Sequence, residues 1–155
     1  MSAAINSRAR VTDAKSADVT RFVADKNRKL LVYHGWSDPM IQAEPTFDYY
    51  RELVDRTFKG NVDAARTQMR LFMLPGVNHC GGGSGPSNWG DQLAPLVEWV
   101  EHGTAPDSLV ATHRTTGVVD NERKICAYPQ HTVYTGPAGQ QNDRANWTAA
   151  NFTCR

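Results

Sequence analysis

The most informative segment of this chain, residues 74–86, is Leu-Pro-Gly-Val-Asn-His-Cys-Gly-Gly-Gly-Ser-Gly-Pro. It follows an apolar run, residues 69–74, that is typical of a buried strand, and it precedes an amphipathic segment that is typical of a helix. The segment therefore predicts a strand-to-helix loop that carries His79, with Cys80 next to it. Such a loop lifts an imidazole off the edge of a sheet, where it can act as a general base.

A second strand-like run ends just before an aspartate. The apolar residues 30–33 are followed by His34-Gly35-Trp36-Ser37-Asp38-Pro39. Parallel α/β sheets bind their ligands at the carboxyl ends of strands, which is where Asp38 is expected. Enzymes of the α/β-hydrolase fold place their catalytic residues in the order Ser, Asp or Glu, His. Asp38 and His79 match the second and third of these, but no G-x-S-x-G nucleophile elbow is present.

Both residues also have an ordinary structural interpretation. Ser-Asp-Pro is favourable turn sequence, and a lone loop histidine is more often structural than catalytic. The catalytic interpretation of His79 is favoured because a strand precedes it, a helix follows it and Asp38 lies upstream. His34 is a weaker candidate that is expected to pack against the following turn. The remaining acids of this region are predicted to be solvated on helix faces or caps, namely Asp48, Asp55, Asp63 and Asp91.

No serine of this region is a good nucleophile candidate. Ser37 and Ser84 lie in Gly-containing segments that end in proline, and neither lies on a strand-to-helix elbow upstream of Asp38. The glycine-rich residues 81–86 lack the Lys-Ser/Thr of a phosphate-binding P-loop and do not match G-x-G-x-x-G running into a helix.

Composition excludes several classes of function. The 155 residues carry a formal charge of +1, with 40% hydrophobic and 21% charged residues, as in an ordinary globular domain. Nothing in this balance predicts binding to nucleic acid or to an anionic membrane, and no run is long enough to cross a bilayer. The first ten residues have no apolar core and do not predict a signal peptide. No cofactor is implied.

A metal-binding module is one alternative. The three cysteines, Cys80, Cys126 and Cys154, form no C-x-x-C pair, which argues against a zinc ribbon or a redox motif. His79 and Cys80 could join His34 or His113 around a metal ion, but their spacing is irregular. We therefore expect no metal site.

Hydrophobic periodicity predicts an α/β fold with a parallel sheet. Strands are expected at 29–33 and 69–74, each buried on both faces, and helices at 17–28, 44–58 and 88–102. Ser16 is the expected cap of the first helix, and Gly60-Asn61 the stop of the second. The last helix is expected to bury one face, made of Trp89, Leu93, Leu96, Val97 and Val100. Two strands are too few for a complete sheet, so partner strands must come from elsewhere.

The chain is predicted to form one partial domain over residues 1–155. Residues 17–103 contain the strand and helix units with Asp38 and His79, and residues 104–155 form a C-terminal extension. Within the extension, residues 108–115 and 117–119 are short β-branched stretches, and the chain is expected to be irregular from Arg123 onward.

Four segments together resemble the tannase and feruloyl esterase family of secreted serine esterases. They are Gly-Trp-Ser-Asp-Pro-Met-Ile at 35–41, Pro-Gly-Val-Asn-His-Cys-Gly-Gly-Gly-Ser-Gly-Pro at 75–86, Leu-Val-Glu-Trp-Val-Glu-His-Gly-Thr-Ala-Pro-Asp at 96–107, and a tail with Ile-Cys-Ala-Tyr-Pro-Gln and Ala-Ala-Asn-Phe-Thr-Cys. The likeness covers nearly the whole chain but only the last part of the family's length. It implies that this chain is the C-terminal part of an α/β-hydrolase fold.

The resemblance implies a role for each candidate residue. His79 corresponds to the base and Asp38 to the acid, while Cys80 is one half of a disulfide whose partner, beside the serine, is missing. Cys126 and Cys154 correspond to a C-terminal disulfide. The family's nucleophile motif Gly-Cys-Ser-x-Gly-Gly, its lid domain and the calcium site of that lid are absent.

The implied reaction is hydrolysis of aromatic carboxylic esters, such as feruloyl or galloyl esters, through an acyl-enzyme on the missing serine. The parent enzyme is expected to be secreted or periplasmic. The isolated chain is expected to be inactive, and to self-associate through an exposed sheet edge and apolar faces. The alternative is a non-catalytic, truncated gene product that acts as a binding or interaction module.

Overall fold

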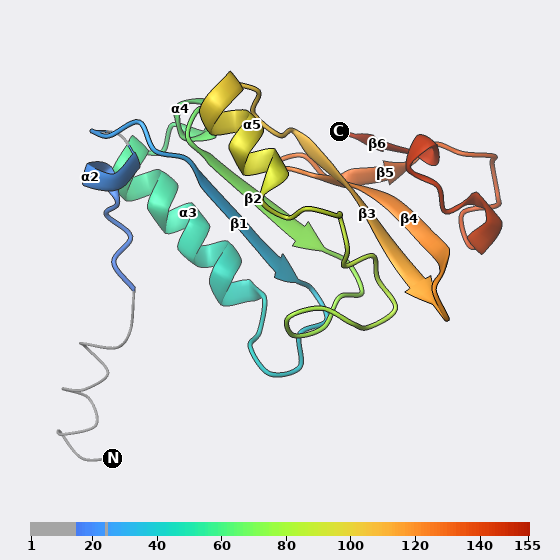
Figure 1. Ribbon diagram of the computed structural model, residues 1–155. Helices are drawn as coiled ribbons and strands as arrows, with labels where there is room; N and C mark the ends of the chain where they lie inside the picture. The colour runs from blue at the N-terminus through green and yellow to red at the C-terminus, as the bar shows by residue number, and fades with distance from the viewer. Residues whose placement is uncertain (1–14, 24) are drawn as a thin grey trace, which may run out of the picture.

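The computed structural model describes residues 15–23 and 25–155 (Figure 1). Their elements are, in order, α2 Thr20–Val23, β1 Leu30–Gly35, α3 Glu44–Phe58, α4 Val62–Arg66, β2 Met69–Leu74, α5 Ala94–His102, β3 Ser108–Thr115, β4 Val118–Cys126, β5 Thr132–Tyr134, the 3₁₀ turns η1 Arg144–Asn146 and η2 Ala149–Asn151, and β6 Phe152–Cys154. The first ten residues, for which no signal peptide is predicted, lie outside the described residues. In the described part of the chain, no helix combines the length and the apolar character that a membrane span needs.

A parallel pair of strands forms the centre of the fold. β1 and β2 pair from Leu30 opposite Met69 to Gly35 opposite Leu74. They alternate with helices, which confirms the predicted α/β class. Because both strands run in the same direction, the loops that follow them emerge at the same end (Figure 1). This arrangement brings the loop of Asp38 to the loop of His79.

Alternate side chains of the two strands enter two different cores. Met69 and Leu71 of β2 pack with Tyr50 and Leu53 of α3 on one face of the sheet. Phe72 of β2 points to the other face and packs against the antiparallel hairpin of β3 and β4. The sheet is thus covered by α3 on one side and by the hairpin on the other.

The strand β1 is less buried than predicted. β2 is buried along nearly its whole length, but most of β1 is half-buried, and Tyr33 is 49% exposed. The reason is that β1 pairs only with β2 among the described residues and forms an edge of the sheet. The expectation of two strands buried on both faces is therefore wrong for β1.

The bounds of α3 agree with the prediction, and Gly60 and Asn61 close its end as expected: the Gly60 N–H donates to the Val54 carbonyl at 3.2 Å and the Asn61 N–H to the Phe58 carbonyl at 3.0 Å. Lys59, with φ +54°, adopts the left-handed conformation that ends the helix, one residue before Gly60. Asn61 also caps the next helix, α4, by accepting a hydrogen bond from the Ala64 N–H at 2.9 Å.

The two other predicted helices are shorter than expected. The helix predicted at 17–28, in which residue 24 lies outside the described part, is formed only from Thr20 to Val23, and Asp18 rather than Ser16 caps it. The helix predicted at 88–102 begins only at Ala94. Asn88 is held in a β-bridge with Thr112, whose backbone N–H bonds to the Asn88 carbonyl at 2.7 Å. Helical periodicity could not reveal this pairing with a distant strand.

The predicted core face of α5 is also wrong. Only Trp99 of this helix is buried, and it packs against the guanidinium of Arg70, whose Cζ lies 5.0 Å from the ring centre. Leu93, Val97 and Val100 form an exposed apolar stripe instead.

The C-terminal extension is tied down by a disulfide between Cys126 and Cys154, which confirms the pairing implied by the resemblance. It contains more regular structure than expected, because β4 continues to Cys126 and β5 pairs with β6. β4 begins at Val118, within the predicted stretch 117–119, and continues beyond it to Cys126, paired with β3 along its length.

Candidate active site

The loops after β1 and β2 are joined by backbone hydrogen bonds. The Trp36 N–H donates to the Leu74 carbonyl at 2.9 Å, and the Ser37 N–H donates to the Val77 carbonyl at 3.0 Å. The approach is so close that a Cβ at Gly35 would collide with the Val77 carbonyl. Glycine at this position therefore allows the two loops to meet.

The loop that carries His79 folds back on itself before the chain reaches α5. The Gly85 N–H donates to the Gly76 carbonyl at 2.9 Å, and Val77 forms a bridge with Gly83. At the tip, Cys80 has a φ of +55°. These bonds fix the backbone of the loop and hold His79 toward the first loop.

Asp38 and His79 form a direct hydrogen bond. Asp38 Oδ2 lies 2.8 Å from His79 Nδ1, and Asp38 Oδ1 accepts the backbone N–H groups of Met40 at 2.8 Å and Ile41 at 2.9 Å. The Asp38 side chain is only 4% exposed. Burial opposes its ionisation, but the hydrogen bonds from Ile41, His79 and Met40 outweigh burial and hold the pKa of Asp38 well below its usual range. Asp38 is therefore a fixed negative charge.

The hydrogen bond to Asp38 determines which imidazole nitrogen of His79 is free. An ionised carboxylate can only accept, so Nδ1 of His79 carries the hydrogen. In the neutral ring Nε2 then holds a lone pair, and among the described residues no group is hydrogen-bonded to it. The side chain of His79 is 34% exposed and lines a hollow of about 330 Å³. This geometry suits a general base.

His34 makes a second contact with the acid, which sequence reasoning assigned only to packing. Its Nε2 lies 3.0 Å from the Ile41 carbonyl oxygen and 3.3 Å from Asp38 Oδ2. Its Nδ1 lies 2.7 Å from Thr46 Oγ1 at the start of α3. His34 thus packs against the turn, as expected, and also faces the carboxylate. The available signal was the spacing of four residues between His34 and Asp38 in a tight turn.

The hollow beside His79 has an aromatic wall. Tyr33 and Trp89 meet edge to face, with ring centres 4.9 Å apart, and both line the hollow. The indole N–H of Trp89 is buried and has no hydrogen-bond partner. The helical periodicity predicts Trp89 on the core face of a helix and does not indicate its place in the hollow, because that place depends on the bridge between Asn88 and Thr112.

Among the described residues, no hydroxyl or thiol is hydrogen-bonded to His79. Ser87 and Cys80 line the hollow, whereas Ser37 and Ser84 are not among its lining residues. Cys80 is an exposed free thiol.

The other residues weighed in the sequence lie apart from this pair. Asp48, Asp55, Asp63 and Asp91 are all exposed, as expected. His113 lies on β3 and pairs with Asp120, with Nδ1 and Oδ1 2.6 Å apart. Over the described ranges, no group of three or more His, Cys, Asp or Glu side chains is arranged to hold a metal ion.

The depressed pKa of Asp38 predicts how acid affects stability. The folded-state pKa lies below the unfolded value of about 3.9, so the stabilisation is complete above that value and is lost as the pH falls below it. Asp120, whose pKa is lowered mainly by its hydrogen bonds from His113 and Thr115, acts in the same direction. We expect Asp38→Asn to flatten the fall in unfolding free energy below about pH 4.

Urea unfolding between pH 2.5 and 6 measures this effect, where the range brackets the aspartate pKa of about 3.9. Asp120→Asn is the matched comparison. It should reduce the dependence of the unfolding free energy on pH by a separate amount. An unchanged slope in Asp38→Asn would contradict the assignment of Asp38 as a charge held by the fold.

The chain is similar to a family of esterases. The family model described as "Tannase and feruloyl esterase" matches residues 1–150. The chain is 41% identical over 144 residues to the mono(2-hydroxyethyl) terephthalate hydrolase of Piscinibacter sakaiensis, which covers 91% of this chain and 22% of the relative. It is 33% identical over 149 residues to feruloyl esterase B of Aspergillus niger, with 84% and 27% covered.

Solved structures agree with the sequence relatives. The crystal structure of feruloyl esterase B from Aspergillus oryzae matches with a TM-score of 0.76 and 29% identity, over 91% of this chain and 29% of that one. A second esterase from Aspergillus oryzae matches with a TM-score of 0.79 and 28% identity, over 91% and 30%. The chain thus spans less than a third of the length of each of these proteins, and it shares the α/β-hydrolase fold of the esterases it matches.

Proposed function

This chain belongs to the tannase and feruloyl esterase family, and we propose that it supplies the acid and the base of a serine hydrolase that cleaves aromatic carboxylic esters. The observation that carries the proposal is the pair of Asp38 and His79, joined at 2.8 Å with Nε2 of His79 open to a hollow. A fixed carboxylate, a correctly protonated imidazole and an accessible lone pair are what a serine nucleophile requires.

In the proposed reaction, Nε2 of His79 accepts the proton of a serine hydroxyl while the serine oxygen attacks the ester carbonyl. Asp38 stabilises the imidazolium that forms, through its bond to Nδ1. The imidazolium then protonates the leaving alcohol, and an acyl-enzyme remains. Water, deprotonated by His79, releases the carboxylic acid and regenerates the serine. The serine comes from a part of the enzyme that this chain does not contain, so the isolated chain has no turnover.

Two observations support an aromatic substrate. The relatives include a feruloyl esterase and a terephthalate monoester hydrolase, both named for esters of aromatic acids. The hollow beside His79 also presents the rings of Tyr33 and Trp89, which can contact an aromatic group edge to face.

A chimera tests the proposal. This chain replaces the matched segment of the Piscinibacter sakaiensis hydrolase, so that the relative supplies the serine and the remaining sheet. We expect the chimera to hydrolyse the relative's ester, while the isolated chain and the remainder of the relative alone do not. A folded but inactive chimera would contradict the proposal.

An oxidising location fits the extension. The disulfide between Cys126 and Cys154 closes a loop with a sequence separation of 28, and such bonds persist mainly outside the reducing cytosol. We propose that the parent enzyme works outside the cytoplasm.

A second candidate function is that of an interaction module. β1 is an edge strand, and Met40, Ile41 and the stripe on α5 are exposed and apolar. Such surfaces favour association with another chain, including a second copy of this one. The chimera separates the two candidates, since an interaction module has no need of an active Asp38 and His79.

A further inference from the structure

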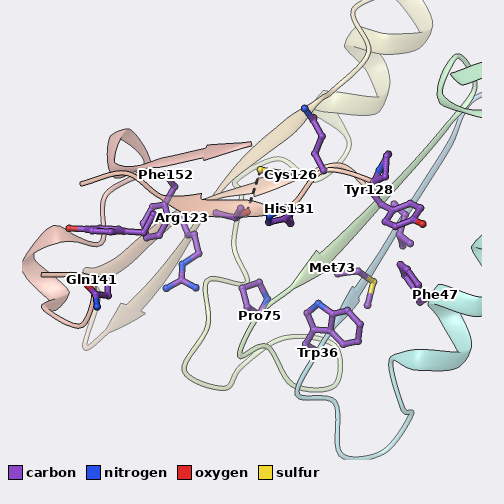
Figure 2. A pocket seen from close by; sticks show the side chains of 15 residues that line it. Trp36, Phe47, Met73, Pro75, Arg123, Cys126, Tyr128, His131, Gln141 and Phe152 are labelled. Atoms are coloured by element: carbon purple, nitrogen blue, oxygen red, sulfur yellow. Dashed lines mark hydrogen bonds between the residues drawn. The ribbon is translucent and has the colours of Figure 1, made fainter. Parts of the chain in front are cut away.

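A second and larger cavity lies on the other side of the sheet from the hollow beside His79. It has a volume of about 570 Å³ and shares no lining residue with that hollow. Leu71 and Met73 of β2 line one side of the cavity, on the sheet face that α3 covers. Residues of the C-terminal extension line the opposite side (Figure 2). Its volume is within the range of roughly 300–1,000 Å³ typical of small-molecule sites.

The lining of this cavity is largely aromatic. Phe47 and Tyr128 meet edge to face, with ring centres 4.9 Å apart, and Trp36 lies 6.5 Å from Phe47. Tyr134 and Phe152 pack at 5.5 Å on the side of the extension. All five line the cavity, so rings face it from both sides. Such walls favour a ligand with an aromatic body.

One cation, the guanidinium of Arg123, points into the cavity (Figure 2). It lies over the rings of Phe152 and Trp147, at 4.9 and 5.4 Å from their centres. Its Nε is buried without a hydrogen-bond partner, and in the described part of the chain no carboxylate pairs with it. No lining residue of the cavity is Asp or Glu. Burial lowers the pKa of Arg123 from its ordinary value, as expected for a charge without a partner.

The neighbouring Arg144 differs from Arg123 in its ion pairing and its exposure. It lies over the same Trp147 ring, at 5.4 Å, but its guanidinium pairs with Asp120 at 3.3 Å and is mostly exposed. It does not line the large cavity. Arg123 therefore differs from it in being half-buried and unpaired. Partial removal of a charge from water without a partner costs free energy, which a bound anion can offset.

We propose that this cavity is a second binding site, which takes a small aromatic carboxylate, with its ring among the aromatic side chains and its carboxylate on Arg123. The free N–H groups of a guanidinium match the two oxygens of a carboxylate. The proposal does not depend on the esterase function, because binding here requires neither a nucleophile nor turnover.

Calorimetric titration of the chain with cinnamate and with cinnamamide tests the proposal. The two probes have the same ring and differ in charge, so the comparison needs no variant. We expect cinnamate to bind at least about tenfold more tightly. Arg123→Gln should remove this preference and leave the amide unaffected, whereas the matched variant Arg144→Gln should retain it. Equal affinity for both probes, or the absence of saturable binding, would overturn the proposal; the latter would indicate a cavity that a protein segment covers.

The indole N–H resonances of the chain locate the bound probe. Trp36 lines the large cavity and Trp89 lines the hollow beside His79. Cinnamate should shift the Trp36 resonance and leave that of Trp89 in place. A shift confined to Trp89 would assign the probe to the catalytic hollow and refute a second site.

Discussion

In the chimera with the Piscinibacter sakaiensis hydrolase, Asp38→Asn is expected to lower kcat by about 10⁴-fold. Asparagine retains the shape of the side chain but offers an N–H or a neutral carbonyl to His79 Nδ1, so the wrong imidazole nitrogen can carry the hydrogen. It also cannot stabilise the imidazolium. His79→Ala should cost at least as much, since it removes the base itself. Steady-state kinetics on the relative's ester measures both effects.

The chain contains its own control for this experiment. Asp120 and His113 form a hydrogen bond of 2.6 Å, similar to that of Asp38 and His79, but on the hairpin of β3 and β4. Asp120→Asn and His113→Ala should leave kcat nearly unchanged. Equal losses in both pairs would mean that the variants act through folding and not through catalysis.

Removing the disulfide is expected to have the largest effect on stability. Cys126 and Cys154 close a loop with a sequence separation of 28, which corresponds to about 3.5 kcal/mol of unfolding free energy in the chain-entropy model. The bond also holds β6 against the end of β4 and so supports the wall of the large cavity. The double variant Cys126→Ser/Cys154→Ser should therefore unfold at a lower denaturant concentration.

Urea or guanidinium unfolding of the chain measures this loss. Cys80→Ser is the control, because Cys80 is an exposed free thiol and its replacement should leave the midpoint unchanged. If Cys80→Ser destabilises the chain as much as the double variant does, the stabilisation does not come from the disulfide.

The sequence predicted the elements whose signals are local. α3 occupies Glu44–Phe58 and β2 occupies Met69–Leu74, as their periodicity indicated, because each buries a continuous apolar pattern. The positions of Asp38 and His79 after the two strands followed from the same patterns. Their mutual contact followed only from the strands being parallel neighbours, which no local pattern records.

Features that depend on partners distant in the sequence could not be predicted from local sequence patterns. The β-bridge of Asn88 with Thr112 keeps Asn88 out of the predicted helix, and α5 begins only at Ala94. The same bridge places Trp89 beside the hollow. The burial of Trp99 depends on Arg70, and the exposure of the remaining α5 face follows from the absence of a packed partner in the described part of the chain. The large cavity combines Trp36 with Arg123 and Phe152, which are far apart in the sequence.

The most direct test of the account is the intact mass of the non-reduced chain before and after treatment with a fluorophosphonate, which labels activated serines. We predict no adduct and a mass two hydrogens below that of the reduced chain, which corresponds to one disulfide and a free Cys80. This result would mean that no serine of this chain is activated, as the account requires of an acid and a base that lack their nucleophile. Stoichiometric labelling that is lost in His79→Ala would contradict the account, because a serine of this chain, with Ser87 in the hollow as the first candidate, would then be the nucleophile.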